Sequence, residues 1–424
     1  MYRDRRHLDI TAANSLSVTH LDTAIRSFLA HRADTADHLA RALAADPQLI
    51  LGHVFRGFLL LLLGRSELFL PARQAHAAAR SVIAARGATT RETQHCEALA
   101  LWLDGEMERS AALLEAALMA QPLDALGFKL LHALLFLLGD AAGMRRAAET
   151  ALPAWSRDMP EFGFVLGCHA FALEETGALD VAERRGRDAI EIEPQDVWAA
   201  HAVAHVYETR RQADAGIAWL RPWQRRLAGI NNFAAHLRWH EALFLLARGD
   251  KGAALALYDE EIRRDRTDDY RDIANAASLL WRLARAGCDV GERWRELADL
   301  AEARMADRAL VFAQLNYLLC LVGAGRPRAA AAMHDAMRRW VREARGTQAR
   351  ILSSVGIPMA RILTSPRRHD AARLTARDLQ AIGGSNAQRS VFERILAGAA
   401  LPAAGDTRSF AQGPEAARPP LTSL

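Results

Sequence analysis

Residues 201–205 read His-Ala-Val-Ala-His, and residues 236–240 read His-Leu-Arg-Trp-His. On an α-helix, residues four apart lie one turn above each other, so each pair of histidines faces one side of its helix. The second pair follows the first by 35 residues at both positions. A repeat unit of two helices with their turns has this length. The stretch 196–250 therefore predicts consecutive helix pairs in which equivalent positions carry histidine.

Glycines mark the same repeat along most of the chain. Each follows an apolar helical run and precedes an alanine-rich one, and they are Gly64, Gly105, Gly139, Gly177, Gly249, Gly287 and Gly325. Their spacings are 41, 34, 38, 72, 38 and 38 residues, so the interval of 72 holds two units and lacks one glycine. We expect the missing turn near Arg211, Gln212 and Ala213, which form a polar cluster. Glycine suits the end of a helix and proline the first turn of the next, so Pro122, Pro160 and Pro194 are predicted to mark the other turns and to begin new helices.

Apolar residues recur at helical spacing within the units, as Leu126, Leu130 and Leu134 do. No strand is expected, because no long segment alternates with period two and β-branched residues are few. The predicted fold is all-α, a right-handed superhelix of about eight antiparallel helix pairs like tetratricopeptide repeats. Residues 1–45 are expected to form N-terminal helices (22–30 and 35–44), residues 46–400 the repeat array, and the Pro- and Gly-rich residues 401–424 a disordered tail.

Composition restricts the classes of partner. The most apolar run, 58–63, is too short to span a bilayer, and no apolar signal segment follows the charged start, so neither membrane insertion nor export is expected. Cys96, Cys168, Cys288 and Cys320 are far apart, which favours reduced thiols and a cytoplasmic location. Basic residues alternate with acids and form no stripe with aromatic residues, so no nucleic-acid binding is expected. The oligomeric state stays open.

Several segments resemble the tetratricopeptide repeat protein 38 family, over about residues 20–400. The matching segments are 196–205 (Asp-Val-Trp-Ala-Ala-His-Ala-Val-Ala-His), Trp239-His240, 257–259 (Leu-Tyr-Asp), 383–389 (Gly-Gly-Ser-Asn-Ala-Gln-Arg) with Val391-Phe392, Gly52-His53, Gln94-His95 and 129–132 (Lys-Leu-Leu-His). The resemblance implies an all-α superhelix of repeats, found in bacteria and animals, and candidate positions rather than a known activity. Three residues depart from the family pattern, at Ala133, where an acid is usual, and at Gln314 and Asn316. These losses of acid and base groups put a shared catalytic activity in doubt.

The histidines in first helices are predicted to line the concave wall of the superhelix, where their side chains converge on one groove. His201, His205, His236 and His240 are candidate ligands of a divalent metal such as Zn²⁺, Fe²⁺ or Mn²⁺. Glu208 is a further ligand or an orienter of His205. The alternative is that these histidines replace apolar repeat residues and form hydrogen bonds in a polar groove. The candidate ligand-binding positions in that groove are His53, His95, Lys129, His132, His169, Glu208, Trp239, Gln388 and Arg389.

Lys129 is unusual because only two of the 54 basic residues are lysines; the other is Lys251, expected at the surface. A desolvated lysine can act as a base or a nucleophile, whereas arginine cannot, and His132 lies one turn away. The alternative is a solvated lysine without a role. In the segment 383–389, Ser385 is expected to cap a helix, with Gln388 and Arg389 in its first turn.

Three classes of function fit the sequence. The first is a repeat protein that binds a peptide or a small ligand in its His-rich groove. The second is an enzyme, metal-dependent or based on His and Lys, that acts on a small molecule there. The third is a purely structural partner. The sequence contains no serine nucleophile elbow, P-loop, dinucleotide-binding glycine motif or HExxH metalloprotease motif, so it does not decide whether the protein is an enzyme.

Overall fold

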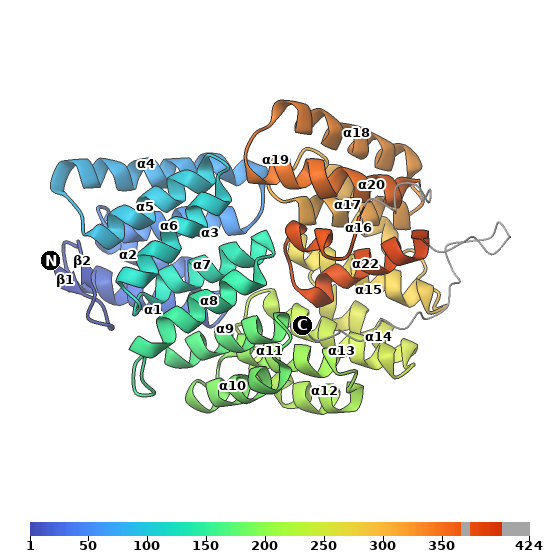
Figure 1. Cartoon of the computed structure of the whole chain (residues 1–424), viewed down its shortest axis with the longest axis horizontal. Coiled ribbons are helices and arrows are strands. Elements are labelled where there is room, and N and C mark those ends of the chain that lie inside the picture. The colour runs from blue at the N-terminus through green and yellow to red at the C-terminus, as the bar shows by residue number, and fades with distance from the viewer. Residues whose placement is uncertain (366–373, 401–424) are drawn as a thin grey trace.

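The computed structural model describes residues 1–365 and 374–400, which are almost wholly helical. Eight antiparallel helix pairs follow one another along this part of the chain (Figure 1), as predicted. Their first helices are α3 (Ile50–Leu62), α5 (Thr90–Leu103), α7 (Ala125–Leu138), α9 (Phe162–Glu175), α11 (Val197–Thr209), α13 (Phe233–Ala247), α15 (Tyr270–Arg285) and α17 (Val311–Gly323). Their second helices are α4 (Phe69–Arg86), α6 (Met107–Ala120), α8 (Ala141–Ala151), α10 (Leu179–Ile192), α12 (Ala213–Leu220), α14 (Lys251–Leu257), α16 (Arg293–Ala303) and α18 (Pro327–Glu343).

The turns after the first helices follow the predicted glycine pattern. All seven predicted glycines have a positive φ, between 63° and 85°, which glycine adopts without a steric cost. In the interval without a glycine, Arg211 takes the same conformation with φ of 58°, so the predicted position of the missing turn is confirmed. The prolines differ from the prediction. Pro122 and Pro194 lie in the turns, ahead of the helix caps Asp124 and Asp196, because the aspartates take the position at which each helix starts.

The N-terminal helices are α1 (Ser15–Leu29) and α2 (Thr35–Ala45). Helix α1 begins before the predicted residue 22, because Asn14 caps it by accepting a hydrogen bond of 2.9 Å from the backbone N–H of Ser17. The capping signal lies outside the apolar pattern on which the prediction rested.

Two short strands precede α1, so the expectation of no strand is wrong for this segment. Strands β1 (Tyr2–Arg3) and β2 (Asp9–Ile10) pair antiparallel. The buried carboxylate of Asp4 holds the turn between them, accepting hydrogen bonds from the backbone N–H groups of Arg6 and Leu8 at 2.8 and 3.0 Å. Strands of two residues leave no period-two pattern in the sequence, which is why the prediction missed them.

The superhelix curls until distant repeats meet. The turn between α1 and α2 lies against the segment before α13, where the backbone N–H of Ala33 donates to the carbonyl of Gly229 at 3.0 Å. On the other side, the N–H of Thr347 donates to the carbonyl of Gly105 at 2.8 Å. Segments far apart in the chain are therefore joined by backbone hydrogen bonds.

The C-terminal elements pack across the repeats as α19 (Thr347–Ile351), the π-helical turn η5 (Leu352–Gly356), α20 (Ile357–Thr364), the 3₁₀ turn η6 (Asp378–Ile382) and α22 (Asn386–Ala400) (Figure 1). The segment between η6 and α22 lies on the end of α7, where the N–H of Gly384 donates to the carbonyl of Phe136 at 3.2 Å. The contact requires glycine at position 139, since a Cβ there would lie 1.8 Å from the carbonyl oxygen of Gln380. The predicted disordered tail, 401–424, lies outside the described residues.

None of the helices in the described ranges combines the length and apolar character that a membrane-spanning helix needs.

Candidate metal centre

The two histidine pairs lie on adjacent first helices, α11 and α13. Asp196 begins α11 by accepting hydrogen bonds from the backbone N–H groups of Trp198 and Ala199, both at 3.0 Å. From that start, the spacing of four residues directs His201 and His205 to one side of α11. The equivalent spacing on α13 directs its own pair back toward α11.

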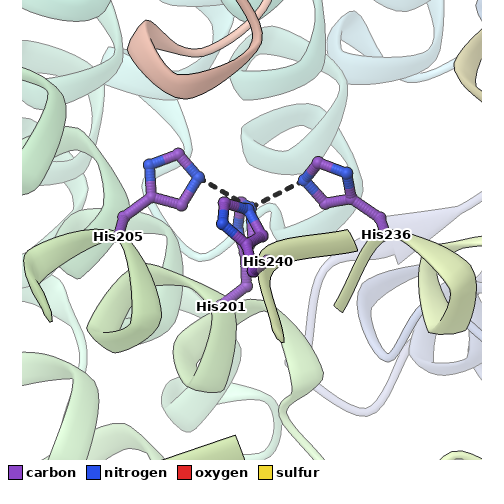
Figure 2. A group of neighbouring side chains, drawn as sticks. All are labelled: His201, His205, His236 and His240. Carbon is purple, nitrogen blue, oxygen red and sulfur yellow. Dashed lines mark hydrogen bonds between the residues drawn. The ribbon is translucent and has the colours of Figure 1, made fainter. Parts of the chain in front are cut away.

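The four imidazole rings converge on one point (Figure 2). Nε2 of His201 lies 2.9 Å from Nε2 of His205 and 3.0 Å from Nε2 of His236. One nitrogen from each of these rings and from His240 lies within 4.8 Å of the others. All four side chains are buried, and the most accessible residue, His236, is 7% exposed.

Side chains on neighbouring helices hold two of the rings by Nδ1. Nδ1 of His240 lies 2.9 Å from Oε2 of Glu208, and Nδ1 of His236 lies 3.0 Å from Oδ1 of Asn275. Because these oxygens accept hydrogen bonds, the network assigns the proton of each ring to Nδ1 and the lone pair to Nε2. Both lone pairs therefore face the centre of the cluster.

Two carboxylates hold the third ring. Nδ1 of His205 lies 3.3 Å from Oε2 of Glu174 and 3.7 Å from Oε1 of Glu175, so Nδ1 carries a proton and Nε2 faces the centre. Nδ1 of His201 has no hydrogen-bond partner among the described residues, and its Nε2 lies between those of His205 and His236. Nitrogen lone pairs that converge in this way require a proton or a metal cation between them.

Burial governs the protonation of the cluster. It lowers the pKa of His201, His236 and His240 well below the ordinary value, and the neighbouring histidines add to this effect. Burial also lowers the pKa of His205, but Glu174 and Glu175 outweigh it and raise that pKa above the ordinary value. At neutral pH, at least three of the rings are therefore in the neutral form that ligates metals.

The distances between the ring nitrogens suit a transition-metal ion after a small adjustment of the rings. Zn–N bonds of ~2.1 Å place the nitrogens of a tetrahedral site ~3.4 Å apart. The two Nε2–Nε2 distances of 2.9 and 3.0 Å are slightly shorter than this, and the outer limit of 4.8 Å is longer, so small rotations of the rings complete the site. Four imidazoles with carboxylate and amide partners behind them suit Zn²⁺ or Fe²⁺ better than a hard cation such as Mg²⁺.

The C-terminal motif supports this centre from behind. The backbone N–H of Asn386 donates to both carboxylate oxygens of Glu175, at 2.9 and 3.1 Å. The guanidinium of Arg389, which is 2% exposed, donates to the same carboxylate at 3.4 Å and to Oδ1 of Asn386 at 2.7 Å. Burial and Glu174 raise the pKa of Glu175 to about 7, although Arg389 and His205 act against them. Arg389 therefore acts on the histidine centre through Glu175 and does not line a groove.

Ser385 caps α22 as expected. Its Oγ accepts a hydrogen bond of 3.2 Å from the N–H of Gln388, whose side chain accepts one of 3.0 Å from the N–H of Ser385. This reciprocal pair is a capping box, so the structure places Gln388 at the helix start rather than at a ligand.

Lys129 and His132 lie close to the histidine centre on α7. Nζ of Lys129 is 3.2 Å from Nε2 of His31 and 4.6 Å from the ring centre of Trp198. The ring of His132 is 5.7 Å from that of Trp198, which in turn is 5.1 Å from the ring of His201. His31 was missed in the sequence because it stands in a short turn about 100 residues before Lys129. This separation is roughly three repeats of ~34 residues, so no local pattern connects the two residues. Its only local signal was the polar turn around it.

Trp239 packs behind the centre. Its ring stacks on that of His236 at 5.2 Å, and its indole N–H donates to the hydroxyl of Ser278 at 3.0 Å. It is fully buried, so it positions a ring rather than contacting a ligand.

Three predicted groove histidines lie elsewhere. Nε2 of His53 is 2.8 Å from the carbonyl of Pro47, near the N-terminus of α3. His95 lies 3.0 Å from Asp124 within a buried ion-pair cluster. Nε2 of His169 lies 3.9 Å from Oε1 of Glu149. The prediction of one groove lined by all of these histidines is therefore wrong for these three, because each first helix has different neighbours.

The residues that depart from the family pattern also lie outside the centre. Nε2 of Gln314 donates to the carbonyl of Asp307 at 3.0 Å, and Nδ2 of Asn316 donates to the carbonyl of Phe312 at 2.9 Å. Ala133 is half-buried on α7. All three changes therefore leave the four histidines and their partners intact.

Comparison with known proteins adds little to this geometry. No protein-family model matches the sequence. Among solved structures, the chain is similar to the TPR (tetratricopeptide repeat) domain of P58(IPK), with 12% sequence identity, 82% of this chain and 88% of that chain covered, and a TM-score of 0.22. A score this low carries no argument, so the repeat architecture rests on the helix pairs and turns described above.

Proposed function

We propose that the protein binds a divalent transition-metal ion, Zn²⁺ or Fe²⁺, through His201, His205, His236 and His240. The observation that supports this most is the direction of the lone pairs. Three rings direct Nδ1–H toward side chains outside the centre, which are Asn275, Glu208 and Glu174. Their Nε2 atoms therefore face one another and His201. A metal ion between them replaces the repulsion between lone pairs by four bonds.

The charges around the site suit a dication. The imidazoles are neutral ligands, and Glu174, Glu175 and Glu208 stand behind two of them. Such carboxylates orient histidine ligands and increase their basicity. The guanidinium of Arg389 pairs with Glu175 at 3.4 Å and so compensates the negative charge of that carboxylate.

We further propose that the ligand of this protein is a small molecule rather than a peptide. The four histidines are at most 7% exposed, so an extended peptide in an open groove does not reach them. A six-coordinate ion such as Fe²⁺ keeps two positions for a small ligand or water, and reactions at those positions are the basis of an enzymatic role.

The second candidate is a structural metal that fastens α11 to α13. The complete set of four buried nitrogen donors favours it, since structural Zn²⁺ sites have closed four-coordinate shells. Co²⁺ substitution separates the two functions. A four-coordinate spectrum that added small anions leave unchanged indicates a structural site, and a five- or six-coordinate spectrum that responds to them indicates an open one.

The first test is metal analysis of the full-length protein after purification and dialysis with Zn²⁺ or, without oxygen, with Fe²⁺. We expect about one equivalent in the wild type and almost none in His201→Ala or His240→Ala. His53→Ala is the matched control, because His53 lies outside the centre, and it should retain the metal. Equal metal content in all four proteins would contradict the proposal.

Membership of the tetratricopeptide repeat protein 38 family and a cytoplasmic location are further proposals. The first is supported by the segments 196–205 and 383–389, which contribute two of the histidines and the partners of Glu175. The second is supported by four cysteines that are free thiols.

A further inference from the structure

Next to the histidine centre, a second group of buried polar side chains surrounds Lys129. Lys129 is 4% exposed, and no carboxylate of the described residues lies within 4 Å of its ammonium nitrogen. Its neighbours are Nε2 of His31 at 3.2 Å and the thiol of Cys168 at 3.8 Å. A buried ammonium group without a counter-charge is strongly unfavourable, so this position favours an anion beside it.

The other groups around Lys129 are unpaired hydrogen-bond donors or neutral rings. The indole N–H of Trp198 and both ring nitrogens of His132 are buried without a hydrogen-bond partner among the described residues. Burial and the charge of Lys129 lower the pKa of His31 and of His132 well below the ordinary value, so both rings are neutral. Nε2 of neutral His31 can accept a hydrogen bond from Lys129. The ammonium and the indole N–H together offer more donors than the neighbouring side chains accept.

Aromatic rings connect this group to the histidine centre. The ring of His31 contacts those of Trp198, at 5.2 Å, and Phe233, at 4.6 Å, and these two rings contact each other at 5.3 Å. The rings of Trp198 and Phe233 lie 5.1 and 5.0 Å from the ring of His201. Apolar aromatic walls with a few directed donors are typical of small-molecule sites. The rings of Trp198 and Phe233 therefore contact both the group around Lys129 and the histidine centre.

We propose that Lys129 and Trp198 bind the carboxylate of a small organic acid whose other end faces the four-histidine centre. The orientation toward that centre rests on the proposed metal function, whereas the carboxylate contact rests on Lys129 and Trp198 alone. The ammonium supplies the counter-charge and the indole N–H a second hydrogen bond, so one carboxylate satisfies both donors. If His201, His205, His236 and His240 hold the proposed metal, the hydroxyl or carbonyl group at the other end of the acid would be a further ligand for it.

Asp196 is the competing counter-charge. One of its oxygens accepts the two backbone hydrogen bonds that begin α11, and the other has no hydrogen-bond partner and points at Gly167, where a Cβ would lie 2.1 Å from it. Burial raises the pKa of this carboxyl to about 7, while its backbone hydrogen bonds and Lys129 act in the opposite direction. Asp196 lies against α9, which Lys129 also contacts through Cys168 at 3.8 Å, but no ion pair within 4 Å joins its carboxylate to the ammonium among the described residues.

The test uses the full-length protein, loaded with Zn²⁺ or treated with chelator, and sodium glycolate as the probe. Glycolamide, which has no charge, and sodium chloride at equal ionic strength are the comparison solutes. We expect glycolate to raise the melting temperature in a concentration-dependent way and the other two solutes not to do so. Titration calorimetry with the same solutes gives the affinity.

Lys129→Met should lower the affinity for glycolate about tenfold or more, the size of one charge-assisted hydrogen bond. Lys251→Met is the matched control, because Lys251 is the other lysine of the chain and is exposed on α14. It should bind glycolate like the wild type. Trp198→Phe keeps the ring and removes the N–H, and it should weaken binding by a smaller factor, which gives a second measurement if the methionine variant does not fold.

Two results would overturn the inference: no binding of glycolate to the wild type, or equal binding to the wild type and to both site variants. Metal content distinguishes this failure from failure of the proposed function. If no variant or wild-type sample holds metal but glycolate still requires Lys129, the metal proposal fails and the carboxylate site stands. If metal binds with full stoichiometry and Lys129 has no effect on glycolate, the carboxylate site fails alone.

Discussion

The N-terminal ion-pair cluster and the four-histidine centre both bury polar groups, but they satisfy them in different ways. In the first, the guanidinium of Arg6 contacts Asp4, Asp22 and Glu161 at 2.9–3.0 Å, and Arg91 contacts Asp124 at 2.7 Å. In the second, nitrogens of the same kind face one another at 2.9 and 3.0 Å.

This difference separates a structural cluster from a binding site. Opposite charges in the N-terminal cluster neutralise one another without a bound ligand, so the cluster needs no role beyond stabilising the fold. Like groups in the histidine centre require a proton or a metal cation between them, and a metal cation is a component that the chain itself does not supply. The kind of group that converges, rather than burial or polarity, therefore indicates function.

The largest expected effect comes from breaking the complementary cluster. Arg91→Met removes the guanidinium from the buried carboxylate of Asp124 and leaves only His95 paired with it, and we expect a loss of about 3–5 kcal/mol in the free energy of unfolding. Chemical denaturation of the chelator-treated protein measures it. Arg73→Met, which breaks an exposed pair with Asp104, is the control and should change stability little. A small effect of Arg91→Met on stability, or a loss of metal in that variant, would remove the distinction between the clusters.

Acid should destabilise the two clusters in different pH ranges. The folded-state pKa of His201, His236 and His240 lies below the unfolded value near 6.5, so the unfolded chain binds more protons below that pH. Stability should fall as pH decreases from 6.5, by about 1.4 kcal/mol per pH unit for each ring that stays neutral. His205 has a raised pKa and acts in the opposite direction: its contribution is present below 6.5 and is lost as pH rises through its folded value.

Asp124 should respond only in stronger acid. Arg91 and His95 overcome the effect of its burial and hold its pKa well below 3.8, so its contribution is present above that pH and is lost as pH falls through the folded value. Denaturation of chelator-treated wild type and of His201→Ala at pH 7.5, 6.5 and 5.5 tests the first range. A wild-type curve that stays flat to pH 5 would contradict neutral, buried rings.

Metal should stabilise the wild type and leave the histidine variants unchanged. At Zn²⁺ concentrations of about 100 times the dissociation constant, we expect a gain of about 2.7 kcal/mol in the free energy of unfolding. His240→Ala should lose this gain, whereas His53→Ala should keep it. The same increase in both variants would place the metal elsewhere on the chain.

The smallest expected effect tests the support from the C-terminal motif. Arg389→Met removes the guanidinium from Glu175, which pairs with His205, and we expect metal affinity to fall by about 10–100-fold with one equivalent still bound at saturation. Competition with a chromogenic chelator measures the affinity. Arg394→Met, a later position on α22, is the comparison variant. Unchanged affinity in Arg389→Met would show that the motif serves only the packing of α22.

Much of the fold follows from local pattern. Glycine spacing, helical periodicity and the polar cluster at Arg211 predict the pairs and their turns, since each depends on residues close in the chain. The short strands and the early start of α1 escaped prediction because the first is set by Asp4 and the second by a capping side chain.

The sequence by itself determined that the chain forms an all-α array and that two histidine pairs occupy equivalent positions 35 residues apart. Helical spacing and repeat length suffice for both. Only the tertiary structure decided which side chains join those pairs: Asn275 from α15, Glu174 and Glu175 from α9, and Arg389 from α22. The tertiary structure also places His31 beside Lys129, His53 beside the carbonyl of Pro47 and His95 beside Asp124. These contacts depend on how far the superhelix curls, which is set by packing summed over all repeats rather than by any local pattern.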